Sequence, residues 1–147
     1  MDPRLLAGGA ADLYHRLVNT QEAARRWAEV WTRAWPARDV QSIAALYADN
    51  TRYLSYPFRD PDEGITGARE YLTRTLNEED NIECWFGEPV ASEERAAIEW
   101  WASWTEDGLD ITLAGTSLLR FDDEGLVVDH RDYWNQFDGR RPPYDRW

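Results

Sequence analysis

The residues best suited to chemistry lie near the end of the chain, in the segment LVVDHRDYWN. An imidazole, His130, and a carboxylate, Asp132, are two positions apart, so in a β-strand their side chains project from the same face. Leu126, Val128 and Trp134 share that face, which places the acid among apolar neighbours. Burying a carboxylate costs free energy unless the group is paired or used. The segment therefore indicates a polar site within an apolar pocket.

Three long strands have to position these groups. Two tight turns, Asp107-Gly108 and Glu124-Gly125, separate runs rich in β-branched and aromatic residues over 94–104, 109–121 and 126–136. Short turns of this kind between such runs are typical of β-hairpins. The pattern predicts a curved antiparallel sheet, one face of which is covered by the upstream part of the chain.

The upstream part reads as helices with one short strand. Helices are predicted over 20–35, capped by Thr20 and stopped by Pro36, over 39–48, and over 66–76, capped by Thr66; strands are predicted over 51–58 and 82–90. Trp27, Trp31 and Trp35 recur every four residues, which indicates a buried helical face and, as the less favoured alternative, the wall of a ligand pocket. The element order predicts an α+β fold with three helices on one face of the sheet.

Composition excludes several classes of function. The 147-residue chain has a net charge of −12, which argues against nucleic-acid and anionic-membrane partners. Every basic residue is Arg, so Schiff-base lysine chemistry and the phosphate-binding P-loop are excluded. One Cys and two distant His provide no metal-ligand spacing. We expect no metal and no cofactor.

The chain reads as one domain with short flanking segments. We expect an N-terminal extension over 1–19, a single domain over 20–137, and a Pro-rich, aromatic tail over 138–147 that lies on the surface. The start of the chain lacks the basic residues and unbroken apolar core of a signal peptide, and no long apolar run follows. A cytoplasmic protein is the expectation.

Two segments carry a resemblance to a known family. LYADNTRYLSYPF (46–58) and RFDDEGLVVDHRDYWN (120–135) resemble the nuclear-transport-factor-2-like superfamily, in particular its SnoaL-like polyketide cyclase and limonene-epoxide-hydrolase branch. The resemblance covers about residues 20–137. It implies a cone-shaped (cystatin-like) curved antiparallel sheet whose concave face is packed by three helices. The fold hosts isomerases, cyclases, dehydratases, hydrolases and proteins without known chemistry.

The resemblance also suggests roles for individual residues. Asp132 matches a catalytic carboxylate of the epoxide hydrolases, Tyr53 matches a tyrosine that holds the hydrolytic water, and Ser55 stands where that family has Asn. Those enzymes have an Arg and an Asp two residues apart on the strand that contains AIEWWASW. The alignment places Glu99 and Trp101 at these positions, so epoxide hydrolysis by that mechanism is disfavoured.

These considerations give a candidate site. Catalytic roles are assigned to Asp132 as base and to His130 and Tyr53 as proton partners; substrate contacts are assigned to Ser55, Glu99, Trp101, Trp134 and Trp31. Acids and an imidazole in one aromatic-walled space can divide acid and base roles, because burial and like charge separate their pKa values. Such a site suits proton abstraction beside a carbonyl, or cyclisation, on a small apolar or polycyclic molecule.

Three alternatives remain open at this stage. Asp132 can instead pair with an Arg, and Glu99 is a surface charge if the strand's alternation is shifted by one residue. The domain can also be a noncatalytic binding or accessory module. Tryptophans on the outer sheet face predict a homodimer formed through that face, because an exposed apolar patch is otherwise costly.

Overall fold

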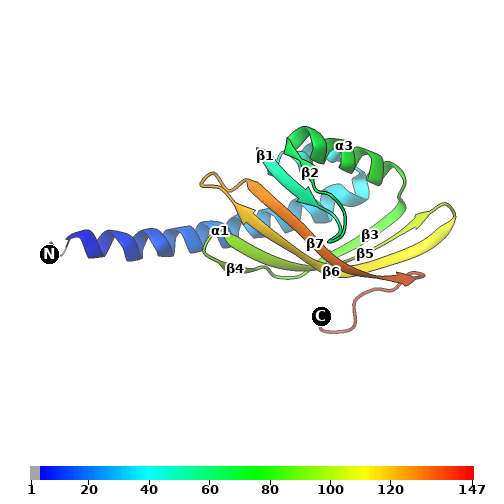
Figure 1. The fold of residues 1–147 in the computed structure, drawn as a ribbon. Helices are drawn as coiled ribbons and strands as arrows, with labels where there is room; N and C mark the ends of the chain where they lie inside the picture. The colour runs from blue at the N-terminus through cyan, green and yellow to red at the C-terminus, as the bar shows by residue number, and fades with distance from the viewer. Residues whose placement is uncertain (1–3) are drawn as a thin grey trace.

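The computed structural model describes residues 4–147, which form three helices and a seven-stranded sheet (Figure 1). The helices are α1 (Arg4–Ala37), α2 (Val40–Ala44) and α3 (Gly64–Asn77). The strands are β1 (Tyr47–Leu54), β2 (Asp62–Glu63), β3 (Asp80–Phe86), β4 (Val90–Ser92), β5 (Arg95–Glu106), β6 (Leu109–Phe121) and β7 (Val127–Asp138). None of the described helices is long and apolar enough to cross a membrane.

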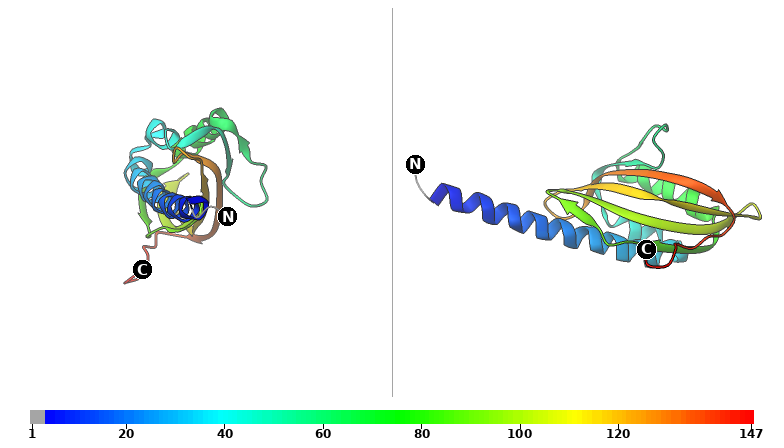
Figure 2. Two further views of the ribbon diagram at one scale, coloured as in Figure 1. Left: turned by 90° about the vertical axis from the view of Figure 1, so that its left-hand side faces the viewer. Right: turned by 90° about the horizontal axis from the view of Figure 1, so that it is seen from below.

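The sheet is curved and open, with the strand order β2-β1-β7-β6-β5-β3, and β4 pairs with β5 at one end. Neighbouring strands are antiparallel except β1 and β7, which run parallel. The helices lie on the concave side, and the N-terminal turns of α1 project beyond the sheet (Figures 1 and 2). This arrangement confirms the predicted α+β cone, and the long β5–β6–β7 meander confirms the three predicted strands.

The tryptophan stripe of α1 forms the centre of the core. Trp27, Trp31 and Trp35 are all buried, and successive rings contact each other at centroid distances of 5.6 and 5.4 Å. Trp35 also packs on Trp100 and Trp104 of β5. The preferred core interpretation is therefore confirmed, although the same rings also line a cavity.

Three local predictions are wrong at their boundaries. Thr20 lies within α1 instead of capping it, and its hydroxyl donates to the Glu93 carbonyl at 2.6 Å. Thr66 lies inside α3, which begins at Gly64 after an extended Glu63. Tyr47 belongs to β1 because α2 ends at Ala44. For Thr20 and Tyr47, the hydrogen bond to Glu93 and the pairing with Val127 outweigh a local propensity of a few tenths to about 1 kcal/mol.

Gly115 permits an unusually close approach between β6 and β7. It pairs with Trp134, and a Cβ built at this position would lie 2.1 Å from the Tyr133 carbonyl oxygen and 2.7 Å from the Trp134 Cβ. Only a residue without a side chain fits beside the neighbouring backbone here. Trp134 itself lines the cavity on the concave side of the sheet.

Candidate functional site

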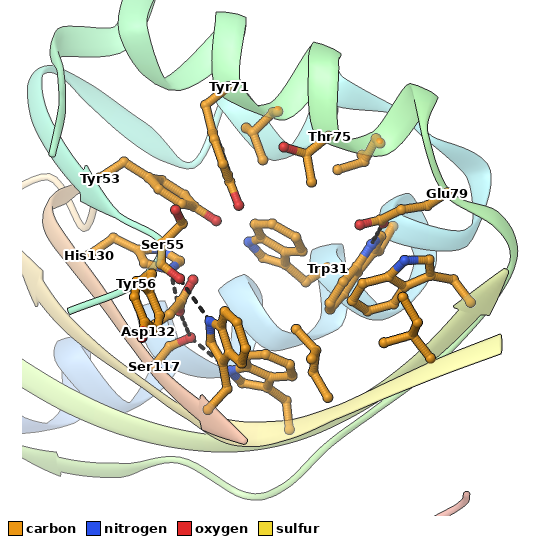
Figure 3. Close-up of a pocket in the computed structure, with 18 of the residues that line it drawn as sticks. Trp31, Tyr53, Ser55, Tyr56, Tyr71, Thr75, Glu79, Ser117, His130 and Asp132 are labelled. Carbon is orange, nitrogen blue, oxygen red and sulfur yellow. Dashed lines mark hydrogen bonds and ion pairs between the residues drawn. The ribbon is translucent and has the colours of Figure 1, made fainter. Parts of the chain in front are cut away.

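A cavity of about 350 Å³ lies between the concave face of the sheet and helices α1 and α3 (Figure 3). Its aromatic lining consists of Trp27, Trp31, Trp35, Tyr53, Tyr56, Tyr71, Phe86, Trp100, Trp104 and Trp134. Its polar lining consists of Ser55, Arg59, Thr75, Glu79, Glu106, Ser117, His130, Asp132 and Gln136. A cavity of this size that combines an aromatic wall with polar groups is typical of small-molecule sites.

Asp132 is held on the cavity wall through one of its two carboxylate oxygens. β6 and β7 pair Ser117 directly with Asp132, and the Ser117 hydroxyl donates to Asp132 Oδ1 at 2.6 Å. His130 Nε2 lies 2.6 Å from the same oxygen. Within the described residues Oδ2 has no hydrogen-bond partner. The carboxylate is therefore oriented by its inner oxygen, and the other oxygen is left for a ligand.

His130 connects Asp132 to a buried hydroxyl. Its Nδ1 lies 2.7 Å from the Tyr47 hydroxyl, which accepts a hydrogen bond from Trp27 Nε1 at 3.0 Å. If Tyr47 donates to Nδ1, the imidazole is neutral and its Nε2–H donates to Asp132. Tyr53 stacks on the imidazole with ring centroids 4.0 Å apart. Only 1% of the surface of His130 is exposed, and its hydrogen bond to Asp132 orients the carboxylate.

Donor groups gather beside this carboxylate. The hydroxyls of Tyr53 and Tyr71 and the indole of Trp31 point toward one another in Figure 3. Burial raises the pKa of both tyrosines, and the charge of Asp132 raises it further, so both remain neutral donors. Trp31 Nε1 is buried and makes no hydrogen bond of standard geometry with the described residues, and the nearby Tyr47 hydroxyl is already engaged by Trp27 and His130. An unpaired buried donor is costly, which makes this cluster suited to receive a ligand's oxygen.

Glu79 is a functional candidate that the sequence did not single out. It follows α3, lines the cavity and is 2% exposed, and its Oε1 accepts a hydrogen bond from Trp35 Nε1 at 2.8 Å. Burial raises the pKa of this carboxyl to about 7, and the Trp35 bond lowers it only in part. In the sequence, Glu79 stands in the acidic run EED, which reads as a solvated loop. No local pattern marks the middle acid as buried.

Burial of Glu79 predicts a pH-dependent stability. A carboxyl with a pKa near 4.5 when unfolded and about 7 when folded favours the folded state fully below pH 4.5, and this advantage is lost as pH rises to 7. The side chain in Glu79→Gln stays neutral at every pH. Between pH 4.5 and pH 8, the free energy of unfolding of this variant should therefore rise by about 3 kcal/mol relative to that of wild type. Urea denaturation at both pH values measures this. Glu78→Gln, at the exposed neighbour, is the matched control; parallel pH profiles for wild type and Glu79→Gln would contradict the prediction.

The structure places most of the predicted site residues together. Asp132, His130, Tyr53, Ser55, Trp31 and Trp134 all line the cavity. Trp134 Nε1 donates to the Ser55 carbonyl at 2.8 Å, which ties β7 to the end of β1. Roles in catalysis or ligand contact remain predictions for all six.

Glu99 and Trp101 do not line the cavity, so the prediction that they contact ligand is wrong. The alternation of β5 is shifted by one residue, so that Trp100 faces inward and its neighbours face outward. Glu99 is exposed and accepts a hydrogen bond from Trp147 Nε1 at 3.1 Å. Trp100 and Trp101 are adjacent and equally apolar, so the sequence alone did not show which of them faces inward.

The alternative that Asp132 pairs with an Arg is not what the structure shows. The nearby guanidinium groups of Arg131 and Arg120 instead contact Asp129, at 2.9 and 3.7 Å. Asp132 is bonded to His130 and Ser117, and Trp101 does not block the cavity. The described residues contain no cluster of three metal-ligating side chains.

Comparison with known proteins gives a family and a fold. A family model for the SnoaL-like domain matches residues 24–130. No curated protein matches the chain in sequence.

Solved structures resemble this one at low sequence identity. RV0760c from Mycobacterium tuberculosis is 18% identical over 80% of this chain and 96% of its own, with a TM-score of 0.70. SalBIII, an epoxide hydrolase/cyclase-like enzyme with a role in pyran ring formation in polyether salinomycin, is 19% identical over 78% of this chain and 92% of its own, with a TM-score of 0.69. An M. tuberculosis LEH-like epoxide hydrolase is 17% identical over 81% of this chain and 84% of its own, with a TM-score of 0.65. At these identities the likeness establishes the fold.

Proposed function

This chain belongs to the SnoaL-like domain family, and we propose that it is a cofactor-independent enzyme whose cavity binds a small, largely apolar carbonyl compound and whose Asp132 moves a proton. The observation that carries the proposal is the orientation of Asp132. Two donors hold its Oδ1, and Oδ2 remains unpaired at the wall of an aromatic cavity. A fixed carboxylate in such surroundings suits general base catalysis.

The reaction supported best is proton abstraction beside a carbonyl, followed by isomerisation or ring closure. Removing that proton leaves negative charge on the carbonyl oxygen, which needs donors already in place. Tyr53, Tyr71 and the unpaired Trp31 Nε1 supply such donors close to Asp132 (Figure 3). The base and the donors therefore face the same part of the cavity.

Epoxide hydrolysis by the family's carboxylate-and-arginine mechanism is less well supported. The alignment placed the family's Arg and Asp at Glu99 and Trp101. Shifting it by one residue along β5 gives the buried residues Trp100 and Ala102 at these positions. Neither can activate water or protonate an epoxide. Arg59 lines the cavity, but its guanidinium lies over the Tyr71 ring and contacts Asp62.

A noncatalytic ligand-binding module is the second candidate. A continuous, buried series of hydrogen bonds joins Trp27, Tyr47, His130, Asp132 and Ser117. Such a network can rigidify the cavity wall without any role in catalysis. In that case ligands bind but undergo no proton exchange. The absence of proton exchange in a bound ligand would distinguish a binding module from an enzyme.

Native mass spectrometry against apolar ketones and polycyclic aromatics tests the proposal. We expect at least one ketone to bind and to exchange its α-protons with D₂O faster in the presence of protein. Binding without exchange would favour the module, and absence of binding across the panel would contradict both candidates.

We also propose that the protein forms a homodimer through the outer face of the sheet. Leu118 of β6 and Tyr133 of β7 lie on the outer face of neighbouring strands and are 40% and 44% exposed. We expect light scattering to give a dimer mass for wild type and a monomer mass for Tyr133→Asp, because a charge in an apolar interface is costly. A monomeric wild type would contradict this.

A further inference from the structure

Glu79 and Asp132 occupy opposite sides of the same cavity, and only Asp132 takes part in the proposed reaction (Figure 3). Aromatic and aliphatic side chains fill most of the wall between them. Three carboxyl groups line the cavity; Glu106 is partly exposed, whereas Glu79 and Asp132 are buried and lie at opposite sides. A ligand that fills this space meets both.

The Trp35 indole accounts for only one oxygen of Glu79. That indole needs a single acceptor, which Oε1 supplies at 2.8 Å. Within the described residues no side chain donates to Oε2 and no cation forms an ion pair with Glu79, although Arg38 and Glu106 influence it electrostatically. A buried carboxyl can accept several hydrogen bonds, and leaving most of them unmade is costly. A ligand group is therefore expected to complete its hydrogen bonding.

We propose that Glu79 is a second ligand-binding residue, which takes a hydroxyl group at the end of the substrate remote from Asp132. The inference rests on the proposed function, because it assumes that this cavity receives the substrate. A hydroxyl donates to the ionised carboxylate and accepts from the protonated acid, so it satisfies Glu79 in either state. The substrate class is accordingly a hydroxylated, otherwise apolar carbonyl compound.

A pair of nearly isosteric probes tests the assignment. 6-(Hydroxymethyl)-2-acetonaphthone and 6-ethyl-2-acetonaphthone differ only by OH in place of CH₃, and quenching of the cavity tryptophans reports their binding. An apolar cavity without a hydroxyl site favours the ethyl probe, because the hydroxyl loses its water. We expect wild type to favour the hydroxymethyl probe by roughly tenfold, and Glu79→Leu to reverse the order.

Glu79→Gln is the second test variant, in case Glu79→Leu does not fold. It retains an acceptor for Trp35 and is expected to keep a weaker preference for the hydroxymethyl probe. Asp132→Asn should leave the preference unchanged. The assignment is overturned if both probes bind wild type equally, or if Asp132→Asn rather than Glu79→Leu abolishes the preference. If neither probe binds wild type, this inference fails, and the proposed function fails with it only if no ketone of the wider panel binds; if probes bind without α-proton exchange, only the catalytic proposal fails.

Discussion

Asp132→Asn is expected to slow α-proton exchange of a bound ketone by about 10²–10⁴-fold, the range typical for loss of a general base. The amide oxygen can still accept from Ser117 and His130, so the local hydrogen bonds survive. The amide nitrogen then replaces Oδ2, and it cannot take a proton from carbon. The variant should therefore bind ketones while failing to exchange them, which NMR of the ligand in D₂O measures directly.

Asp129→Asn provides the matched control. Asp129 lies on the same strand, three residues away, and contacts Arg131 and Arg120 instead of lining the cavity. The same substitution there should leave exchange at the wild-type rate. If folded Asp132→Asn exchanges ketone protons as fast as wild type, Asp132 is not the base.

Gly115→Ala is expected to destabilise the fold by about 3 kcal/mol or more, at the upper end of the cost of overpacking. The new Cβ would lie 2.1 Å from the Tyr133 carbonyl oxygen and 2.7 Å from the Trp134 Cα. Backbone atoms cannot turn away as a flexible side chain can, so β6 and β7 must separate. A lower midpoint of urea denaturation measures the effect, and loss of ketone affinity should accompany it because Trp134 lines the cavity.

Gly87→Ala, at a glycine directly after β3, separates this clash from the general effect of replacing a glycine. A Cβ at Gly87 approaches no atom closer than 3.6 Å, at the Glu99 carbonyl and the Trp147 ring. That is ordinary van der Waals contact, so this variant should remain within about 0.5 kcal/mol of wild type. Equal midpoints for Gly115→Ala and Gly87→Ala would contradict the close approach of β6 and β7.

Periodicity and turn residues were sufficient to predict the long strands. Asp107-Gly108 and Glu124-Gly125 end their strands through local backbone preferences, with φ of 50° at Asp107 and 76° at Gly125. The two-residue alternation of β7 likewise places His130 and Asp132 on one face, whatever surrounds them. Helix boundaries were less predictable: the Thr20 hydroxyl donates to the Glu93 carbonyl, 73 residues away, from inside α1, and α3 begins at Gly64, two residues before the predicted cap Thr66.

The sequence by itself determined the α+β class, the tryptophan face of α1 and the placement of His130 and Asp132 on one face of a strand, since each depends on residues close together in the chain. Tertiary structure decided the rest. The direction of Glu99 depends on the register of β5 against β6, and the burial of Glu79 depends on Trp35, 44 residues away along the chain. Which oxygen of Asp132 is left unpaired depends on Ser117 from another strand. These features arise from contacts between distant segments, for which local patterns carry no physical signal.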